Sequence, residues 1–576
     1  MNDDDLFPPP PFYFRLPKFV RSVPPSPSVT HSADQQQQPN TTQLAALPVT
    51  MRPIEEDTDE LASDFDDDPV DEQQQHDQNE QQQHDGDGED VAKATEGGTT
   101  TVCRRAEQPP PPQYGSVASK QQQQLQQQKS RPGFREKHFK NEAPLLEQYF
   151  DLNDGQHVVL FNFFTAVFFL MVMAAWAQDF YLYGNPFHHL WLIAWNFHQL
   201  PQTLLIWSIM FCSTILCPFF GIFLWHNLAP PEATTVWPRV LLTMGYIVYQ
   251  LAFFYYSIRA IFWLNLQGAC SFIITCENTR IAMKIHSFFR ESLANYGTVQ
   301  RSEKSGENES SEGSCLDQFI YFMFCPTFIY RDEYPQSPTR SWRKVGRHLV
   351  GCLASMYFVS LCFSQWIIPH FSALSYPEDI RMHLLLATIF PSIIPGSIAL
   401  FLGIFYGLLH SWLSMFAEAL RFADRRFYAN WWSSRNMAEY YRNWNLVVHD
   451  WLYAYIYRDI SMLLGMRWGP AVSQCLVFFL SAFFHEYWFS VSLRMFYPAI
   501  FTLYFIFGGI FFLISRMIKR QYVWNTLMWW NLLIGTGIFV VGYASEWYAR
   551  QRCAQVYQNV LVDTLVPRSW ACHRIS

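Results

Sequence analysis

Hydrophobic positions beyond residue 143 gather into long, nearly uninterrupted segments. About 20 apolar residues in a helix cross a hydrocarbon layer of about 30 Å. Eight such segments are visible, and a ninth is expected between Trp412 and Leu464, where helix-like sequence carries more charge. The pattern predicts an all-α, polytopic protein with about nine transmembrane helices. The eight segments are Val158–Ala177, Thr203–Trp225, Val240–Trp263, Val350–Ile368, Leu384–Leu409, Val472–Leu493, Ala499–Ile514 and Trp524–Tyr543.

Residues 1–135 have a different composition, with proline runs, glutamine tracts and an acidic stretch. Between Pro53 and Val91 there are 17 Asp or Glu and no Lys or Arg, so the net charge of −8 becomes about +9 for the rest of the chain. Such a segment buries too little apolar surface to fold alone. We expect a disordered cytosolic tail at 1–135 and a membrane-embedded domain at 136–576, whose basic loops are typical of cytosolic positions.

The polar connection between the third and fourth segments contains an amphipathic stretch. Ile281 to Phe289 places Lys284 and His286, followed by Arg290, among apolar residues. This pattern predicts a helix that lies along the bilayer surface.

Two titratable side chains, His485 and Glu486, stand inside the segment Val472–Leu493. Ionisable groups at that depth are costly and usually functional. A neutral imidazole can accept a proton, which is what activates a hydroxyl for attack on a thioester. Ser481, one turn earlier, could orient the ring or contact a substrate. The structural alternatives are a histidine bonded to a neighbouring helix and a serine bonded to its own backbone.

A second polar cluster lies between Tyr440 and Trp451. If this stretch is helical, Arg442, Asn445 and His449 fall at i, i+3 and i+7 on one face. Asn445 could donate to a developing oxyanion, Arg442 could meet a phosphate, and His449 could do either. A purely structural stripe on an interfacial helix is the alternative.

Competing motifs are excluded by counting residues. Phe489 stands where a zinc-protease helix needs its second histidine, and Ala454 stands where a His-x4-Asp motif needs its aspartate. Glycine-rich phosphate loops and paired CxxC motifs are missing from the sequence, and nucleic-acid binding has no support. We therefore expect chemistry without a metal or cofactor.

Cys553 and Cys572 flank a polar loop after the last apolar segment. A bond between them would close about 20 residues, add on the order of 3 kcal/mol and indicate an oxidising lumen. Spacing alone leaves the bonded and free forms equally open.

These motifs resemble the membrane-bound O-acyltransferase family, and more narrowly its sterol O-acyltransferase branch. The resemblance runs from about Leu145 to the C-terminus. It implies a multi-pass endoplasmic reticulum enzyme that moves a long-chain acyl group from acyl-CoA, a substrate rather than a cofactor, onto a sterol for storage, and that assembles as a homodimer or homotetramer. The matching stretches are 422–428, 440–457, 481–487, 328–332, 546–550 and 567–570.

The resemblance also assigns roles to individual residues. It implies that His485 is catalytic, at the meeting point of an acyl-CoA tunnel and a sterol entrance, and that Asn445 holds the thioester. It further implies a lumenal disulfide between Cys553 and Cys572. The residues implied to line the acyl-CoA site are Arg442, Asn445, His449, Tyr457 and Ser481.

The chain departs from the family at an aromatic signature, usually Phe-Tyr-x-Asp-Trp-Trp-Asn. Asn430 replaces the aspartate and Ser433 replaces the final asparagine. If that carboxylate fixes the loop through an ion pair, its loss is expected to lower efficiency without changing the reaction.

Two rivals remain. Diacylglycerol acyltransferases share the histidine and a similar signature, although the triplet His449-Asp450-Trp451 and the Pro-Arg-Ser-Trp tail favour the sterol branch. A sterol-binding or transport protein that kept the fold without the chemistry is the rival from another class.

Overall fold

A computed structural model describes residues 136–151, 156–228, 236–304, 315–372, 382–555 and 557–571. The predicted tail at 1–135 lies outside the described residues. Apart from two isolated bridges, Glu142 with Asp424 and Gln336 with Phe422, the regular structure in these ranges is helical. The all-α prediction is confirmed.

Within these ranges, seven helical stretches are long and apolar enough to cross a membrane. They match seven of the eight predicted segments, and the eighth forms a shorter apolar helix, Ala499–Ser515. The expected ninth span between Trp412 and Leu464 is wrong, because short helices with breaks occupy that region. The seven stretches are Phe161–Tyr183, His188–Trp225, Trp237–Trp263, Trp342–Ser372, Phe390–Ala419, Arg467–Leu493 and Gln521–Arg552.

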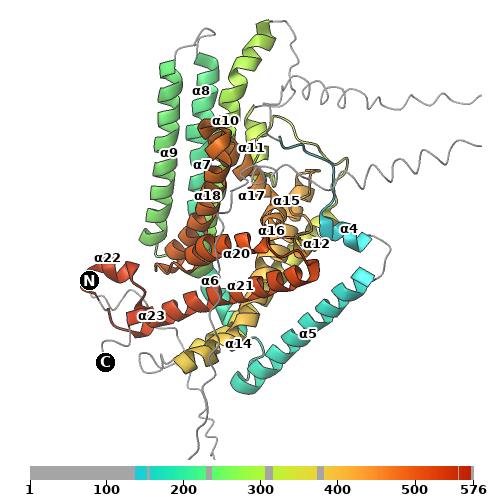
Figure 1. The fold of residues 1–576 in the computed structure, drawn as a ribbon, viewed down its shortest axis with the longest axis vertical. Helices are drawn as coiled ribbons and strands as arrows, with labels where there is room; N and C mark the ends of the chain where they lie inside the picture. Colours follow the sequence, from blue (N-terminus) through green and yellow to red (C-terminus); the bar gives the residue numbers. More distant parts are fainter. Residues whose placement is uncertain are drawn as a thin grey trace, which may run out of the picture. The chain divides into compact units, whose positions relative to one another are not determined.

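One group of helices packs around α10 (Gly268–Lys304), which lies beside α7 (Leu200–Thr214), α8 (Phe220–Leu228) and α9 (Val236–Trp263) (Figure 1). The surface-lying helix predicted at 281–289 is part of α10, and this prediction is wrong. Ile281 and Ile285 are fully enclosed. The Lys284 ammonium is also buried, where it donates to the carbonyls of Phe322 (2.5 Å) and Cys325 (2.6 Å). These acceptors lie at the end of α11 (Cys315–Phe324), so the Lys284 N–H groups satisfy carbonyls that a helix end leaves open.

A second group contains α12 (Trp342–Cys362), α14 (Met382–Leu400) and α21 (Gln521–Arg552), whereas α18 (Arg458–Leu493) packs mainly against α10. Helices α14 and α21 approach closely because glycines face their neighbours. A Cβ on Gly396 would lie 3.2 Å from Val540, and one on Gly537 would lie 2.8 Å from the Cα of Ile393. Ser397 Oγ donates across this contact to the Leu533 carbonyl at 2.8 Å. Small residues and polar bonds are the usual means of helix association in lipid, where apolar contacts alone give little preference.

Residues 420–457 form an irregular region between α15 (Leu413–Ala419) and α18. They contain a loop at 420–430, the turn η6 (Trp431–Ser433), α16 (Met437–Trp444), α17 (Leu446–Leu452) and the π-helix η7 (Tyr453–Tyr457). The remaining helical elements are α4 (Leu145–Asp151), α5 (Gln156–Tyr183), η2 (His188–Leu190), α6 (Trp191–Phe197), η3 (Ile215–Phe219), η4 (Phe363–Ile367), α13 (Ile368–Ser372), η5 (Phe401–Trp412), α19 (Ala499–Phe501), η8 (Thr502–Phe507), α20 (Gly508–Ser515), α22 (Val560–Leu565) and α23 (Arg568–Ala571).

Candidate active site

His485 lies in the second half of α18, beyond a kink at Gly465, whose φ of 75° suits only a residue without a side chain. Its Nδ1 is 2.7 Å from the Ser481 carbonyl oxygen. A carbonyl only accepts, so Nδ1 carries the hydrogen, and in a neutral ring Nε2 then holds the lone pair. The geometry selects the tautomer that can act as a base through Nε2.

Ser481 orients the ring through its backbone, not through its hydroxyl. The bond runs from the imidazole to the carbonyl four residues earlier, so another residue type at 481 could supply the same acceptor. The predicted orienting role is therefore met by the helix itself, and the Ser481 hydroxyl retains only its proposed role in substrate contact.

His485 is half-buried, with intermediate exposure of its surface. The same intermediate exposure applies to every residue from 441 to 454. Helix α17, which lies within this run, has no fully buried side chain. Both predicted clusters are therefore partly accessible rather than sealed inside the protein.

Asn445 interrupts the helical structure and separates α16 from α17. Its φ of −146° and ψ of 87° are extended, and its Oδ1 accepts from the Val448 N–H at 3.2 Å as the N-cap of α17. The prediction of one helix with Arg442, Asn445 and His449 on a single face is therefore wrong, because two helices meet at Asn445. The cap holds the amide oxygen, which leaves the Nδ2 hydrogens as the donors that Asn445 can offer a ligand.

His449 begins a ladder of stacked rings. Its imidazole lies 6.4 Å from the Tyr453 ring at 17°, and Tyr453 lies 5.5 Å from Tyr457 at 16°. Tyr457 is buried at the end of η7. Arg442 is in the last turn of α16, before the break. These three predicted acyl-CoA residues therefore come from three consecutive short elements.

Helix α10 brings the two clusters together. The Trp451 indole on α17 donates to the Met283 carbonyl (3.1 Å) and to Ser287 Oγ (2.9 Å). The Trp488 indole, 4.6 Å from the His485 ring, donates to Thr279 Oγ1 at 2.9 Å. Thr279 and Met283 are four residues apart, about 6 Å along a helix. The histidine turn and α17 thus contact adjacent turns of α10, a helix that the sequence analysis had placed at the surface.

Glu486 has a role that the sequence did not reveal. Its carboxylate accepts from the Tyr543 hydroxyl (2.6 Å), from Ser490 Oγ (3.0 Å) and from the Phe501 N–H (3.2 Å). These donors lie on α21, on α18 and at α19, so Glu486 fixes the rotation of α18 while the neighbouring His485 points elsewhere. The adjacent pair of titratable residues was visible in sequence, but its partners were not.

The loop that carries the altered aromatic signature is held in place without a carboxylate at position 430. The Ala429 N–H donates to the Asn443 carbonyl and the Leu446 N–H donates to the Phe427 carbonyl, both at 2.9 Å. Asn430 Oδ1 is buried, with no hydrogen-bond partner among the described residues. Backbone bonds therefore tie this loop to α16 and α17 whatever the charge at position 430.

The predicted disulfide is only partly visible. Cys553 is disulfide-bonded, whereas Cys572 lies outside the described residues, so their pairing stays a prediction.

Known proteins are similar to this chain over most of its length. Residues 190–545 match the family model of the membrane-bound O-acyltransferases. The chain is 33% identical to sterol O-acyltransferase 1 of Mus musculus over 447 residues, which is 77% of this chain and 81% of that protein. It is 34% identical to sterol O-acyltransferase 2 of Homo sapiens over 440 residues, 76% of this chain and 81% of that protein. The chain therefore belongs to the membrane-bound O-acyltransferase family and is an acyltransferase.

Proposed function

We propose that the protein esterifies a membrane sterol with a long-chain fatty acyl group taken from acyl-CoA. The observation that carries this proposal is the tautomer of His485, whose Nδ1–H bond to the Ser481 carbonyl makes Nε2 the proton acceptor beside the α17 cluster. The sterol O-acyltransferases that the chain resembles suggest a sterol as the acceptor. By its resemblance to the sterol O-acyltransferase branch, the protein is proposed to act in the endoplasmic reticulum membrane.

The proposed reaction has one base and one donor. His485 Nε2 takes the hydroxyl proton while the alcohol oxygen attacks the thioester carbonyl, and the Asn445 amide N–H stabilises the oxyanion. As the C–S bond breaks, the proton passes to the sulfur, so coenzyme A leaves as a thiol and the ring is neutral again. Because a thioester is already activated, positioning and a single base supply much of the acceleration.

Arg442, His449, Tyr457 and Ser481 are proposed to hold the acyl-CoA. A guanidinium suits the coenzyme phosphates, and the ladder formed by His449, Tyr453 and Tyr457 presents flat surfaces along one side of η7. All four side chains are half-buried or buried, so a ligand that they hold would be partly enclosed by the protein.

Labelled acyl-CoA tests the acceptor directly. Membranes containing the protein are incubated with sterol, diacylglycerol or a long-chain alcohol, and the labelled esters are separated. A sterol ester as the main product is expected. A triacylglycerol product would assign the chain to diacylglycerol, and failure to form an ester with any acceptor would favour a binding or transport protein.

A further inference from the structure

The stretch that joins the N-terminal tail to the membrane domain contacts the candidate acyl-CoA site. We propose that residues 136–144, here called the N-terminal strap, position α17 through the ammonium group of Lys137. This makes Lys137 a positioning residue for the reaction, and the inference rests on the proposed function for its kinetic consequence.

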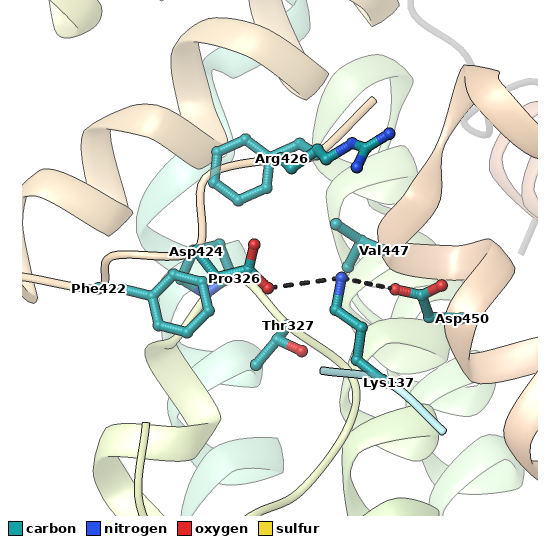
Figure 2. A pocket seen from close by; sticks show the side chains of 9 residues that line it. Lys137, Pro326, Thr327, Phe422, Asp424, Arg426, Val447 and Asp450 are labelled. Atoms are coloured by element: carbon teal, nitrogen blue, oxygen red, sulfur yellow. Dashed lines mark ion pairs between the residues drawn. The ribbon is translucent and has the colours of Figure 1, made fainter. Parts of the chain in front are cut away.

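The Lys137 ammonium lies between two carboxylates from different elements (Figure 2). Its Nζ is 2.9 Å from Asp450 Oδ2 on α17 and 3.4 Å from Asp424 Oδ2 in the loop before the aromatic signature. Lys137 and Asp450 are each less than a quarter exposed. A partly buried pair is screened less by salt than a surface pair, so this bridge can hold its two elements in register.

The pKa values agree with this geometry. Burial alone would lower the pKa of Lys137, but the charges of Asp450 and Asp424 outweigh it and raise that pKa. Burial likewise opposes ionisation of Asp450, yet the neighbouring His449 imidazole and the charge of Lys137 lower its pKa. Burial raises the pKa of Asp424 despite the same ammonium. Asp450 is therefore the stronger partner.

Other contacts fix the strap in place. The Glu142 N–H donates to the Ala423 carbonyl and the Arg425 N–H donates to the Glu142 carbonyl, both at 3.1 Å. The Phe139 ring lies 5.3 Å from Tyr334 and 6.3 Å from Phe422. Lys137 therefore extends from an anchored backbone, and its ammonium cannot drift far from the two carboxylates.

Helix α17 depends on such contacts because it is short and poorly buried. It has seven residues, none of them fully buried, and it starts at the break made by Asn445. Isolated helices of this length are unstable in water. Its position is set by the Asn445 cap, the Trp451 bonds to α10 and the Lys137 bridge to Asp450. Asp450 Oδ1 also lies 3.6 Å from His449 Nδ1, so the bridge connects directly to an imidazole of the candidate site.

The test compares Lys137→Ala with Lys140→Ala in the full-length protein. Lys140 is an exposed lysine of the same strap and is the matched control. Lys137→Ala should raise the KM for acyl-CoA about three- to tenfold with a much smaller change in kcat and in the KM for the acceptor. Lys137→Arg, which keeps the charge, should restore most of the affinity, and Lys140→Ala should behave as wild type.

Hydrogen–deuterium exchange gives a readout that does not need the reaction. The amides of residues 446–452 should exchange faster in Lys137→Ala than in Lys140→Ala. Equal exchange in the two variants would contradict the proposal that the N-terminal strap positions α17. This outcome does not depend on ester formation, so it would hold even if the proposed function failed. Faster exchange with an unchanged KM for acyl-CoA would overturn the positioning role. If Lys137→Ala did not fold, Asp450→Asn removes the same pair from the other side and must give the same pattern.

Discussion

Asn445 combines two tasks in one amide. Its Oδ1 caps α17, and its Nδ2 is the proposed oxyanion donor. Asn445→Ala removes both, so turnover should fall by roughly ten- to a thousandfold and the free energy of unfolding by about 1 kcal/mol. Asn445→Asp keeps a capping oxygen but has no amide hydrogen, so it should retain the wild-type unfolding temperature while losing turnover. Normal turnover in either variant would assign Asn445 to capping alone.

His485 is the proposed base, and its removal gives the largest expected effect. His485→Ala should lower ester formation by at least about a hundredfold while the protein remains folded in detergent, because the proposed base is lost. His198→Ala is the control, since that exposed ring bonds in the same way to the Trp195 carbonyl. Ester formation near the wild-type rate in His485→Ala would remove the residue from the mechanism.

The sequence identifies a single candidate functional residue where placing its side chain inside a membrane costs free energy. A histidine at mid-span is expensive, so His485 stands out without any structure. Glu486 stood beside it, but its partners come from α19 and α21, and no local pattern reports on contacts 15 and 57 residues away. The Asn445 cap was missed because the stretch was treated as one helix, although Asn is a preferred N-cap.

Helix α4 is tied to α12 by charge. The Glu147 carboxylate lies 2.7 Å from Arg347, 3.0 Å from His348 Nε2 and 3.9 Å from Lys344. Burial would raise the pKa of Glu147, but the bond to His348 and the cations lower it from about 4.5 to about 2. Because the folded-state pKa is depressed, the carboxylate stabilises the protein above about pH 4.5, and this stabilisation is lost as the pH falls towards 2.

Glu147→Gln should therefore lower the free energy of unfolding by about 2 kcal/mol at pH 7. The difference from wild type should shrink steadily at pH 4 and pH 3, as followed by thermal unfolding in detergent. Glu142→Gln is the control, because Glu142 pairs through its backbone. A difference between Glu147→Gln and wild type that is the same at every pH would mean that packing, not charge, holds α4.

Hydropathy correctly predicts the long apolar helices. It does not predict that α10 packs inside the protein. Its fully buried residues include Ser271, Asn278, Lys284 and Ser287 as well as apolar ones, because it packs among other helices, where polar groups find partners. A segment that reads as amphipathic by period alone cannot reveal whether its polar face meets water or protein. The same ambiguity led to a spanning helix being expected at 412–464.

Across the complete chain, the number of membrane crossings depends on α10. Four residues separate the end of α9 from the start of α10, which packs back along α9 and α7 (Figure 1). If α10 crosses the membrane, Arg239 at the start of α9 lies on the same side as Arg340, Arg343, Lys344 and Arg347 at the start of α12. That arrangement satisfies the tendency of basic residues to remain cytosolic. In that case α10 and the short helix Ala499–Ser515, added to the seven long stretches, would give nine crossings within the described residues.

Single-cysteine labelling in sealed microsomes distinguishes the two topologies. Arg239→Cys and Lys344→Cys are exposed positions at the starts of α9 and α12, and both should react with a membrane-impermeant thiol reagent added outside. Gln558→Cys, beyond α21, should react only after the vesicles are opened, because five crossings separate it from the start of α12. If Arg239→Cys and Lys344→Cys were labelled from opposite sides, α10 would not cross, and α17 and the His485 turn would be packed against a helix that re-enters the membrane from the lumenal side.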